Sequence, residues 1–138
     1  MALGSSSSSG TDCRPPLEYV YFYLTATCNL SCRHCWIDPG RHRPGDDGRV
    51  LDPGLLKSVV EQAGPMGLKG VKLSGGEPLI HPQILDILEY LRTRNLAVQI
   101  ETNGTACSPE AAQAIAGITS RFVAVSLDGV DAETHEWM

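Results

Sequence analysis

The sequence lacks the excess of basic residues that nucleic-acid-binding proteins usually carry. Its 138 residues include eleven Lys and Arg against sixteen Asp and Glu, which gives a net charge of −5 at pH 7. A protein that binds nucleic acid usually has a basic stripe or patch. We therefore expect no nucleic-acid partner. Charges of both signs gather in residues 40–49, and we interpret this Gly- and Pro-containing segment as a solvated loop.

Long apolar runs and a signal peptide are also missing. No stretch approaches the roughly 18 consecutive apolar residues that a membrane-spanning helix needs. The first sixteen residues, MALGSSSSSGTDCRPP, lack the charged start and apolar core of a signal peptide. We interpret residues 1–16 as a disordered polar tail, and we expect no membrane partner and a cytoplasmic location.

The five cysteines cannot form disulfides alone, because one would be left over. A reducing compartment also favours metal-binding or catalytic thiols over disulfides. We interpret Cys13 as a free thiol in the tail and Cys107 as a small buried residue. The remaining three, Cys28, Cys32 and Cys35, lie in one stretch, TCNLSCRHCW, with CxxxCxxC spacing.

Apolar runs and segments with helical periodicity alternate along residues 17–138. The strand-like runs cover 17–25, 69–74, 96–102 and 121–127. The helix-like segments lie within 51–64, 81–94, 108–117 and 131–138. This alternation predicts an α/β fold with parallel strands joined by right-handed crossovers. An eightfold barrel of about 250 residues uses roughly 31 for each strand and helix, so the chain holds about four such units.

Several finer predictions concern burial and the ends of elements. The first strand is almost continuously apolar, which predicts burial on both of its faces. Asp52 and Ser108 are predicted helix caps, because a proline at the first helical position follows each. The first helix is predicted to bury a stripe of apolar side chains, namely Leu55, Leu56, Val59, Val60 and Ala63. The last helical segment stops at Met138 without a cap signal, so we expect a fragment of a larger protein, truncated within its fourth helix.

Four unusual stretches each follow the C-terminal end of a predicted strand. They are the cysteine loop, SGGEP at 74–78, ETNGT at 101–105 and SLDG at 126–129. In parallel α/β folds the loops at that edge converge and build the functional site. We therefore expect all four stretches to meet at one pocket.

The cysteine loop is typical of a soft metal centre. Thiolates select zinc or iron-sulfur clusters, and a zinc site would need a fourth ligand such as His34 or His42. Zinc sites usually use separate CxxC pairs, whereas here all three thiols share one loop. A 4Fe-4S cube with three protein ligands explains the number directly, since a complete protein ligand set has four. Zinc remains an alternative.

The later motifs have both functional and structural interpretations. Gly75 and Gly76 allow close approach of the backbone to a ligand, and the Glu77 carboxylate can pair with a cationic amine. Paired glycines also mark an ordinary strand-to-helix turn. Asn103 and Asp128 each precede a glycine, so they are candidate ligand contacts or residues of turns with positive-φ glycines.

With these motifs in this order, residues 17–138 resemble the radical S-adenosylmethionine (radical SAM) superfamily. The strings CNLSCRHCW, GGEPL, TNGT and SLDG are most similar to members that modify peptides or act in cofactor and haem biosynthesis. Many of these members carry a further SPASM or twitch domain with additional clusters. The resemblance implies the N-terminal part of a partial TIM-like barrel, with about four of the usual six β/α units.

The resemblance also implies cofactors and residue roles. Cys28, Cys32 and Cys35 would hold a 4Fe-4S cluster whose open iron binds S-adenosylmethionine. The resemblance further implies that Gly75, Gly76 and Glu77 contact the methionine amino group of that cosubstrate. His34 would lie near its adenine. Contacts with its ribose or carboxylate would come from Asn103, Ser126 and Asp128.

The activity implied is that of an oxidoreductase or maturase-type enzyme in its full-length form. A low-potential electron donor would reduce the cluster, S-adenosylmethionine would be cleaved to methionine and a 5′-deoxyadenosyl radical, and the radical would abstract hydrogen from a peptide or biosynthetic substrate. Two alternatives stay open: a zinc- or iron-sulfur-binding module without catalysis, and an inactive truncated family member.

Overall fold

The computed structural model of the chain describes residues 15–37 and 50–137. The predicted tail, except for its last two residues, and the predicted charged loop at 40–49 lie outside the described residues. So do Cys13 and His42. Among the described residues, no helix is both long enough and apolar enough to cross a bilayer.

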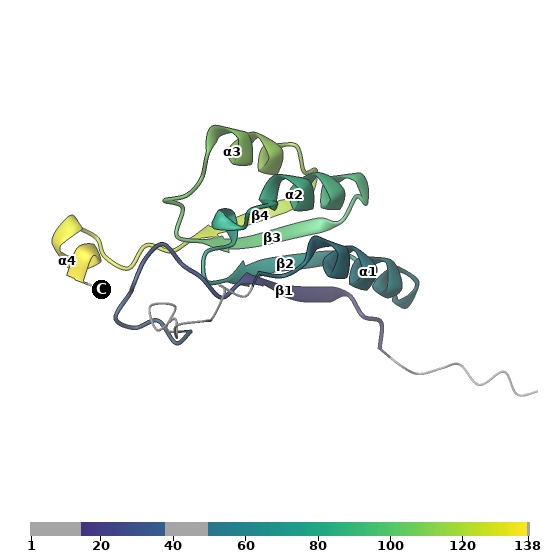
Figure 1. Cartoon of the computed structure of the whole chain (residues 1–138), viewed down its shortest axis with the longest axis horizontal. Coiled ribbons are helices and arrows are strands. Elements are labelled where there is room, and N and C mark those ends of the chain that lie inside the picture. The colour runs from purple at the N-terminus through teal and green to yellow at the C-terminus, as the bar shows by residue number, and fades with distance from the viewer. Residues whose placement is uncertain (1–14, 38–49, 138) are drawn as a thin grey trace, which may run out of the picture.

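A parallel sheet forms the frame of the structure (Figure 1). Its strands are β1 (Tyr19–Thr25), β2 (Gly70–Gly75), β3 (Ala97–Thr102) and β4 (Arg121–Val125), and they pair in the order β1-β2-β3-β4. The spatial order follows the chain order without reversal. Crossovers of one hand then place their helices on one face of the sheet, whereas a doubly wound sheet reverses its order and covers both faces. The predicted α/β fold with parallel strands is confirmed, and its topology is that of a barrel wall.

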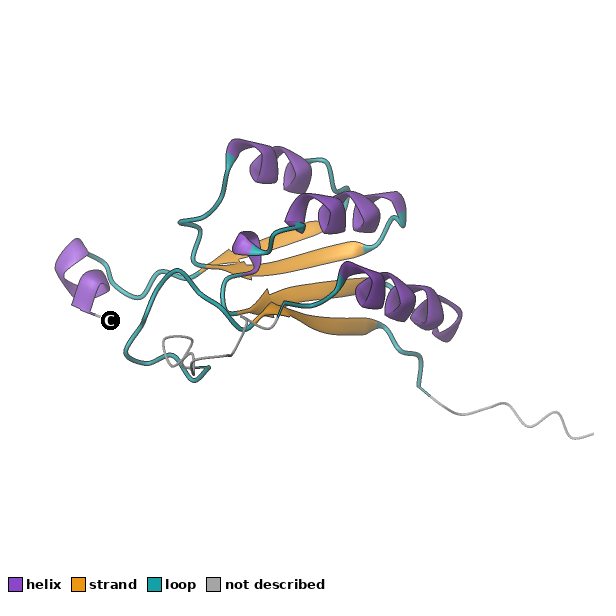
Figure 2. Ribbon diagram, in the orientation of Figure 1, coloured by secondary structure: helices purple, strands orange, loops and turns teal. Residues whose placement is uncertain are grey.

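The helices α1, α2 and α3 cover that one face (Figure 2). The α-helices are α1 (Pro53–Ala63), α2 (Ile84–Thr93), α3 (Pro109–Ala116) and α4 (Ala132–Trp137), and two short 3₁₀ helices are η1 (Gly64–Met66) and η2 (Pro78–Ile80). Both predicted caps are confirmed. An oxygen of Asp52 accepts from the N–H of Gly54 at 3.1 Å, and Ser108 Oγ accepts from the N–H of Ala111 at 3.1 Å. The 3₁₀ helices were not predicted.

The core fills the space between the sheet and these helices. Its fully buried aliphatic side chains come from both layers and include Leu24, Leu73 and Ile100 from strands and Leu56, Leu88 and Leu91 from helices. Alternate residues of β1, β2 and β3 point into this layer because side chains of a strand alternate between its faces, whereas β4 has no buried residue. The core therefore supports the sheet from one side and leaves the strand ends free to carry the site.

Two predictions about burial are wrong. The first strand was predicted to be buried on both faces, but Tyr19, Tyr21 and Tyr23 are 37%, 62% and 54% exposed. They lie on the face of the sheet that is turned away from the helices, and no described element covers them. In α1 the buried stripe is narrower than predicted, since Leu55 is 54% exposed.

Candidate functional site

A cavity of about 320 Å³ lies at the C-terminal edge of the sheet. The loops that follow all four strands contribute to its lining. The structure brings every predicted site residue to this cavity, namely Cys28, Cys32, His34, Cys35, Gly75, Gly76, Glu77, Asn103, Ser126 and Asp128. A neighbouring cavity of about 270 Å³ shares Cys32, Asn103, Ser126 and Asp128 with it. The four stretches that sequence places far apart thus meet in space.

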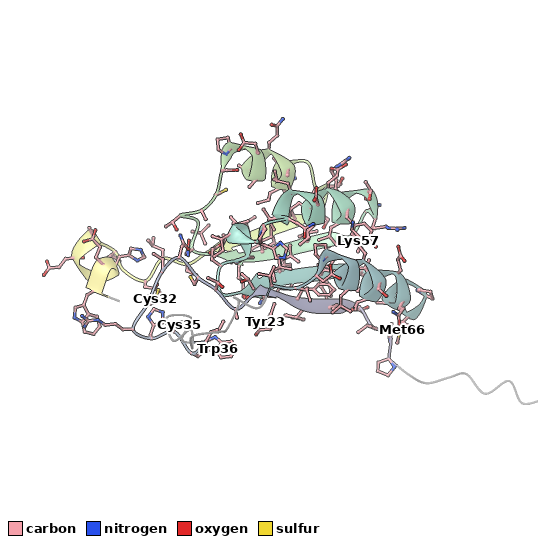
Figure 3. All side chains as sticks on the ribbon, viewed as in Figure 1. Tyr23, Cys32, Cys35, Trp36, Lys57 and Met66 are labelled. Atoms are coloured by element: carbon pink, nitrogen blue, oxygen red, sulfur yellow. The ribbon has the colours of Figure 1, made fainter. Side chains whose placement is uncertain are left out.

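The three cysteines of the loop are free, half-buried thiols. Figure 3 shows Cys32 and Cys35 on this loop, with Trp36 beside them. The N–H of Cys35 donates to the carbonyl of Cys32 at 3.1 Å, which folds the chain into a turn between these two thiols. The rings of Trp36 and Tyr23 pack edge to face, with their centroids 6.3 Å apart. This contact connects the end of the cysteine loop to β1.

The thiols affect one another electrostatically. Burial raises the pKa of Cys32 above its ordinary value of 9.0, and the neighbouring Cys28, Cys35 and Asp128 raise it further. Burial and like charge both disfavour a thiolate. A cationic centre bound among the thiols reverses this effect, because a coordinated thiol is deprotonated. The donor set is therefore suited to a metal centre.

The positions of the three thiols are compatible with a cluster. Within residues 15–37 and 50–137, no group of three or more Cys, His, Asp or Glu side chains converges on a point where one metal ion would bind. A 4Fe-4S cube gives each thiolate a different iron, so the three sulfurs need not converge. Of the two histidines predicted as a possible fourth zinc ligand, His34 has its Nε2 3.7 Å from Asp128 Oδ1, and His42 lies outside the described residues.

The glycines of the SGGEP stretch lie against the start of the cysteine loop. The N–H of Gly76 donates to the carbonyl of Thr25 at 2.7 Å, and the N–H of Glu77 donates to that of Thr27 at 2.9 Å. A Cβ on Gly76 would lie 2.0 Å from the Thr27 oxygen, and one on Gly75, whose φ is 121°, would lie 2.5 Å from the Thr25 oxygen. Two reasons are predicted for these glycines: close approach of the backbone to a ligand and an ordinary strand-to-helix turn. In the structure the chain's own backbone occupies the space beside both glycines.

The Glu77 side chain is 1% exposed and turns inward from the cavity rim. Its Oε1 accepts from the Leu79 N–H at 2.9 Å and from Thr102 Oγ1 at 2.7 Å. Its Oε2 accepts from the Asn103 N–H at 2.8 Å. Glu77 thus caps η2 and joins the end of β2 to the end of β3. Sequence reasoning missed Thr102, because nothing local distinguishes it from the other residues of a strand.

Asn103 and Asp128 behave differently as turn residues. Gly104 has a φ of 77°, so the predicted Asn-Gly turn is confirmed. The prediction of a positive φ for Gly129 is wrong, since the described glycines with positive φ are Gly67, Gly75 and Gly104. Gly129 is crowded instead: a Cβ there would lie 2.5 Å from the backbone nitrogen of His135 in α4.

The strand ends also fix the last two candidate residues. The N–H of Ser126 donates to the carbonyl of Thr102 at 2.9 Å, and the N–H of Asp128 donates to His135 Nδ1 at 3.2 Å. Cys107, by contrast, is exposed and does not line the cavity, so the prediction that it is a buried residue is wrong. It follows the Asn-Gly turn in the loop before α3, where the preceding Ala106 packs against the core and Cys107 itself is exposed.

Comparisons with known proteins identify the family of the chain. The profile of the radical SAM superfamily matches residues 22–138. The mycofactocin maturase MftC of Mycobacterium tuberculosis is 32% identical over 113 residues, which are 82% of this chain and 28% of that protein. The AdoMet-dependent heme synthase of Methanosarcina barkeri is 34% identical over 117 residues, which are 85% of this chain and 33% of that protein. The chain thus spans about a third of the length of these curated relatives.

Solved structures support the fold. The crystal structure of Streptococcus suis SuiB bound to S-adenosylmethionine superposes with a TM-score of 0.76, at 22% identity, over 89% of this chain and 28% of that chain. An identity this low bears on the fold alone. The superposition agrees with a sheet that forms part of a barrel wall. The profile match extends from β1 through α4 and includes all four site stretches. The chain belongs to the radical SAM superfamily.

Proposed function

We propose that this chain is the part of a radical SAM enzyme that binds the 4Fe-4S cluster and S-adenosylmethionine, the two cofactors of the family. One observation carries the proposal: three free thiols of one loop line the same cavity as the GGE segment and the ends of β3 and β4. When bound, the reduced cluster supplies the electron that cleaves S-adenosylmethionine to methionine and a 5′-deoxyadenosyl radical, which abstracts a hydrogen atom from the substrate.

The residues of the chain bind and orient in this proposal. Cys28, Cys32 and Cys35 would hold three of the irons of the cluster, and the fourth iron would have no protein thiolate. Gly75 and Gly76 line the cavity through their backbone, which we expect to contact the methionine end of the cosubstrate.

After β4, Ser126 and Asp128 line both cavities. Their hydroxyl and carboxylate groups suit contact with the ribose hydroxyls or the carboxylate of the cosubstrate. His34 is 3.7 Å from Asp128 and lines the same cavity, where its ring can contact the adenine. Glu77 acts mainly through the loops that it joins, because its carboxylate accepts three hydrogen bonds from the protein.

The substrate we propose is a peptide or a biosynthetic intermediate. Relatives support both classes by name: the subtilosin biosynthesis protein AlbA of Bacillus subtilis is 28% identical over 131 residues, beside the maturase and the heme synthase already described. A second structure of SuiB, at 22% identity, is a complex with the precursor peptide SuiA. The proposal also includes a low-potential electron donor and a cytoplasmic location, where thiols stay reduced.

The test is cluster assembly and cofactor cleavage in a cysteine variant and a matched control. Anaerobically purified wild-type protein should be brown, and Cys32→Ala should lose about four irons relative to it. The variant should also form no 5′-deoxyadenosine from S-adenosylmethionine under a strong reductant. Cys107→Ala should keep both properties, because this thiol is exposed and outside the cavity. Iron content and cleavage that survive in Cys32→Ala would exclude the proposed ligand set, and a colourless protein with one zinc would favour the zinc module.

A further inference from the structure

Three side chains from two loops form a closed ring of hydrogen bonds beside Cys28. Asn103 Nδ2 donates to Asn29 Oδ1 at 2.9 Å, and Asn29 Nδ2 donates to Thr105 Oγ1 at 2.8 Å. Thr105 Oγ1 donates in turn to Asn103 Oδ1 at 2.7 Å and closes the ring. We call Asn29, Asn103 and Thr105 the amide ring. Each member donates and accepts within it, an arrangement in which the bonds polarise one another.

Asn103 is held by its backbone as well. Its N–H donates to Glu77 Oε2 at 2.8 Å, so a buried carboxylate fixes the residue from the sheet side. Its Oδ1 accepts a second bond, from the Thr105 N–H at 2.9 Å. Because a backbone N–H can only donate, the atom facing it must be the amide oxygen, and this fixes the orientation of the whole amide.

The amide nitrogen therefore points toward the cysteine loop. Asn103 Nδ2 lies 3.7 Å from Cys28 Sγ, within the distance of an N–H···S hydrogen bond. The Leu30 N–H also donates to Cys28 Sγ, at 3.4 Å. Both donor hydrogens and both acceptor sites of the Asn103 amide are thus engaged by the protein. No donor or acceptor remains for a cosubstrate ribose or carboxylate, which argues for a positioning role.

Hydrogen bonds to cluster-ligating sulfurs change the reduction potential. A donor stabilises the reduced state more than the oxidised state, because reduction adds negative charge to the cluster and its ligands. Cys28 receives two such donors in the structure, one from the backbone and one from Asn103. Only the second can be removed by substituting a side chain.

We infer that Asn103 is a positioning residue that raises the reduction potential of the cluster through its N–H···S bond to Cys28, and that the amide ring holds it in place. This inference rests on the proposed function, since it assumes a cluster on Cys28. It also assigns a role to Asn29 and Thr105, which the sequence motifs leave without one. The ring connects segments 74 and 76 residues apart, so it joins the cysteine loop to the loop after β3.

The test is a redox titration of the anaerobically reconstituted protein, followed by electron paramagnetic resonance. In Asn103→Ala the ratio of reduced to oxidised cluster, measured at the wild-type midpoint, should fall about threefold to tenfold. At 59 mV per decade for one electron, this is a shift of about 30–60 mV to more negative potential. Thr105→Val, which does not touch the sulfur, should shift the midpoint less and in the same direction. Thr105→Ser keeps the hydroxyl and should have the same midpoint potential as the wild type.

Hydrogen exchange of the cluster-free protein supplies a second measurement. Peptides that cover residues 27–36 should exchange faster in Asn103→Ala and Thr105→Val than in wild type, and Thr105→Ser should match wild type. If Asn103→Ala assembles no cluster, faster exchange in both variants supports the positioning role and unchanged exchange refutes it.

The two proposals fail in different ways. A wild-type protein that binds a cluster, with variants of unchanged midpoint, would overturn the inference and leave the proposed function intact. A wild-type protein that assembles no cluster and cleaves no S-adenosylmethionine would refute the proposed function, and the role of Asn103 in setting the potential with it.

Discussion

Replacing Glu77 by Gln tests whether a buried carboxylate holds the cavity rim together. In the structure Oε1 accepts two hydrogen bonds and Oε2 accepts one, all from donors of the protein. Glutamine has the same shape but only one oxygen. If that oxygen keeps the bonds from Leu79 and Thr102, its NH₂ group faces the N–H of Asn103, and two donors then oppose each other.

The expected cost follows from these contacts. A hydrogen bond to a charged group contributes about 1.5–3 kcal/mol, and a buried donor without a partner costs about 1–3 kcal/mol. The variant loses one charged bond, weakens two others and leaves the Asn103 N–H unsatisfied. A neutral amide is cheaper to bury than a carboxylate, which offsets part of this loss. The net decrease in the free energy of unfolding should be about 2–3 kcal/mol.

Urea unfolding of the cluster-free protein, followed by circular dichroism, measures this difference. Glu89→Gln is the matched control, because Glu89 is an exposed residue of α2 whose partner Arg92 lies on the same helix. Its free energy of unfolding should lie within about 0.5 kcal/mol of the wild-type value, because an exposed ion pair within one helix contributes little. A Glu77→Gln protein whose free energy of unfolding lies within about 0.5 kcal/mol of the wild-type value would refute the reasoning, because the loss of a buried hydrogen bond to a charged group costs more than this.

Two further predictions concern a glycine and an ion pair. Gly76→Ala should lower the free energy of unfolding by at least about 3 kcal/mol in urea, because the new methyl would overlap the Thr27 carbonyl. A hydrogen bond from Lys72 is the main cause that lowers the pKa of Glu101 below 4.5 and raises that of Lys72 above 10.5. At neutral pH the wild type should therefore be more stable than Glu101→Gln. This difference should be lost as pH falls through the lowered pKa of Glu101, and also as pH rises through the raised pKa of Lys72.

Each of these predictions has a control or a contradicting result. Gly64→Ala should be tolerated, because nothing lies within 4 Å of a Cβ at that position. Equal stability of the two alanine variants would contradict the crowding at Gly76. For the ion pair, a difference between wild type and Glu101→Gln that persists unchanged at about pH 2 would show that charge is not its source.

The order of strands and helices could be predicted from the sequence, because each element depends on local periodicity and on its caps. Asp52 and Ser108 show this directly, since each bonds to a backbone N–H within three residues. The loop after each strand could also be assigned to one edge, since parallel strands all end there. The cysteine loop and the GGE segment were recognisable for the same reason: their residue types and spacing are local.

The remaining features depend on contacts that the sequence does not reveal. The apolar character of Tyr19, Tyr21 and Tyr23 says nothing about whether another element covers them. The inward direction of Glu77 depends on Thr102, 25 residues away. Cys107 is exposed although its neighbour Ala106 packs against the core, and its small apolar side chain gives no sign of that difference.

The links between the strand ends have a consequence for how this cavity can change. Glu77 and the two glycines connect the loops after β1, β2 and β3, so a substitution in one of these loops disturbs the other two. Such a rim can accept only coordinated changes during evolution or engineering. The loop after β4 is attached through the main-chain N–H groups of Ser126 and Asp128, of which the first donates to the Thr102 carbonyl and the second to the His135 side chain. Replacing the side chain of Ser126 or Asp128 leaves these two donors in place. Single substitutions that reshape the cavity should therefore accumulate beside β4, while the other three loops vary as one block.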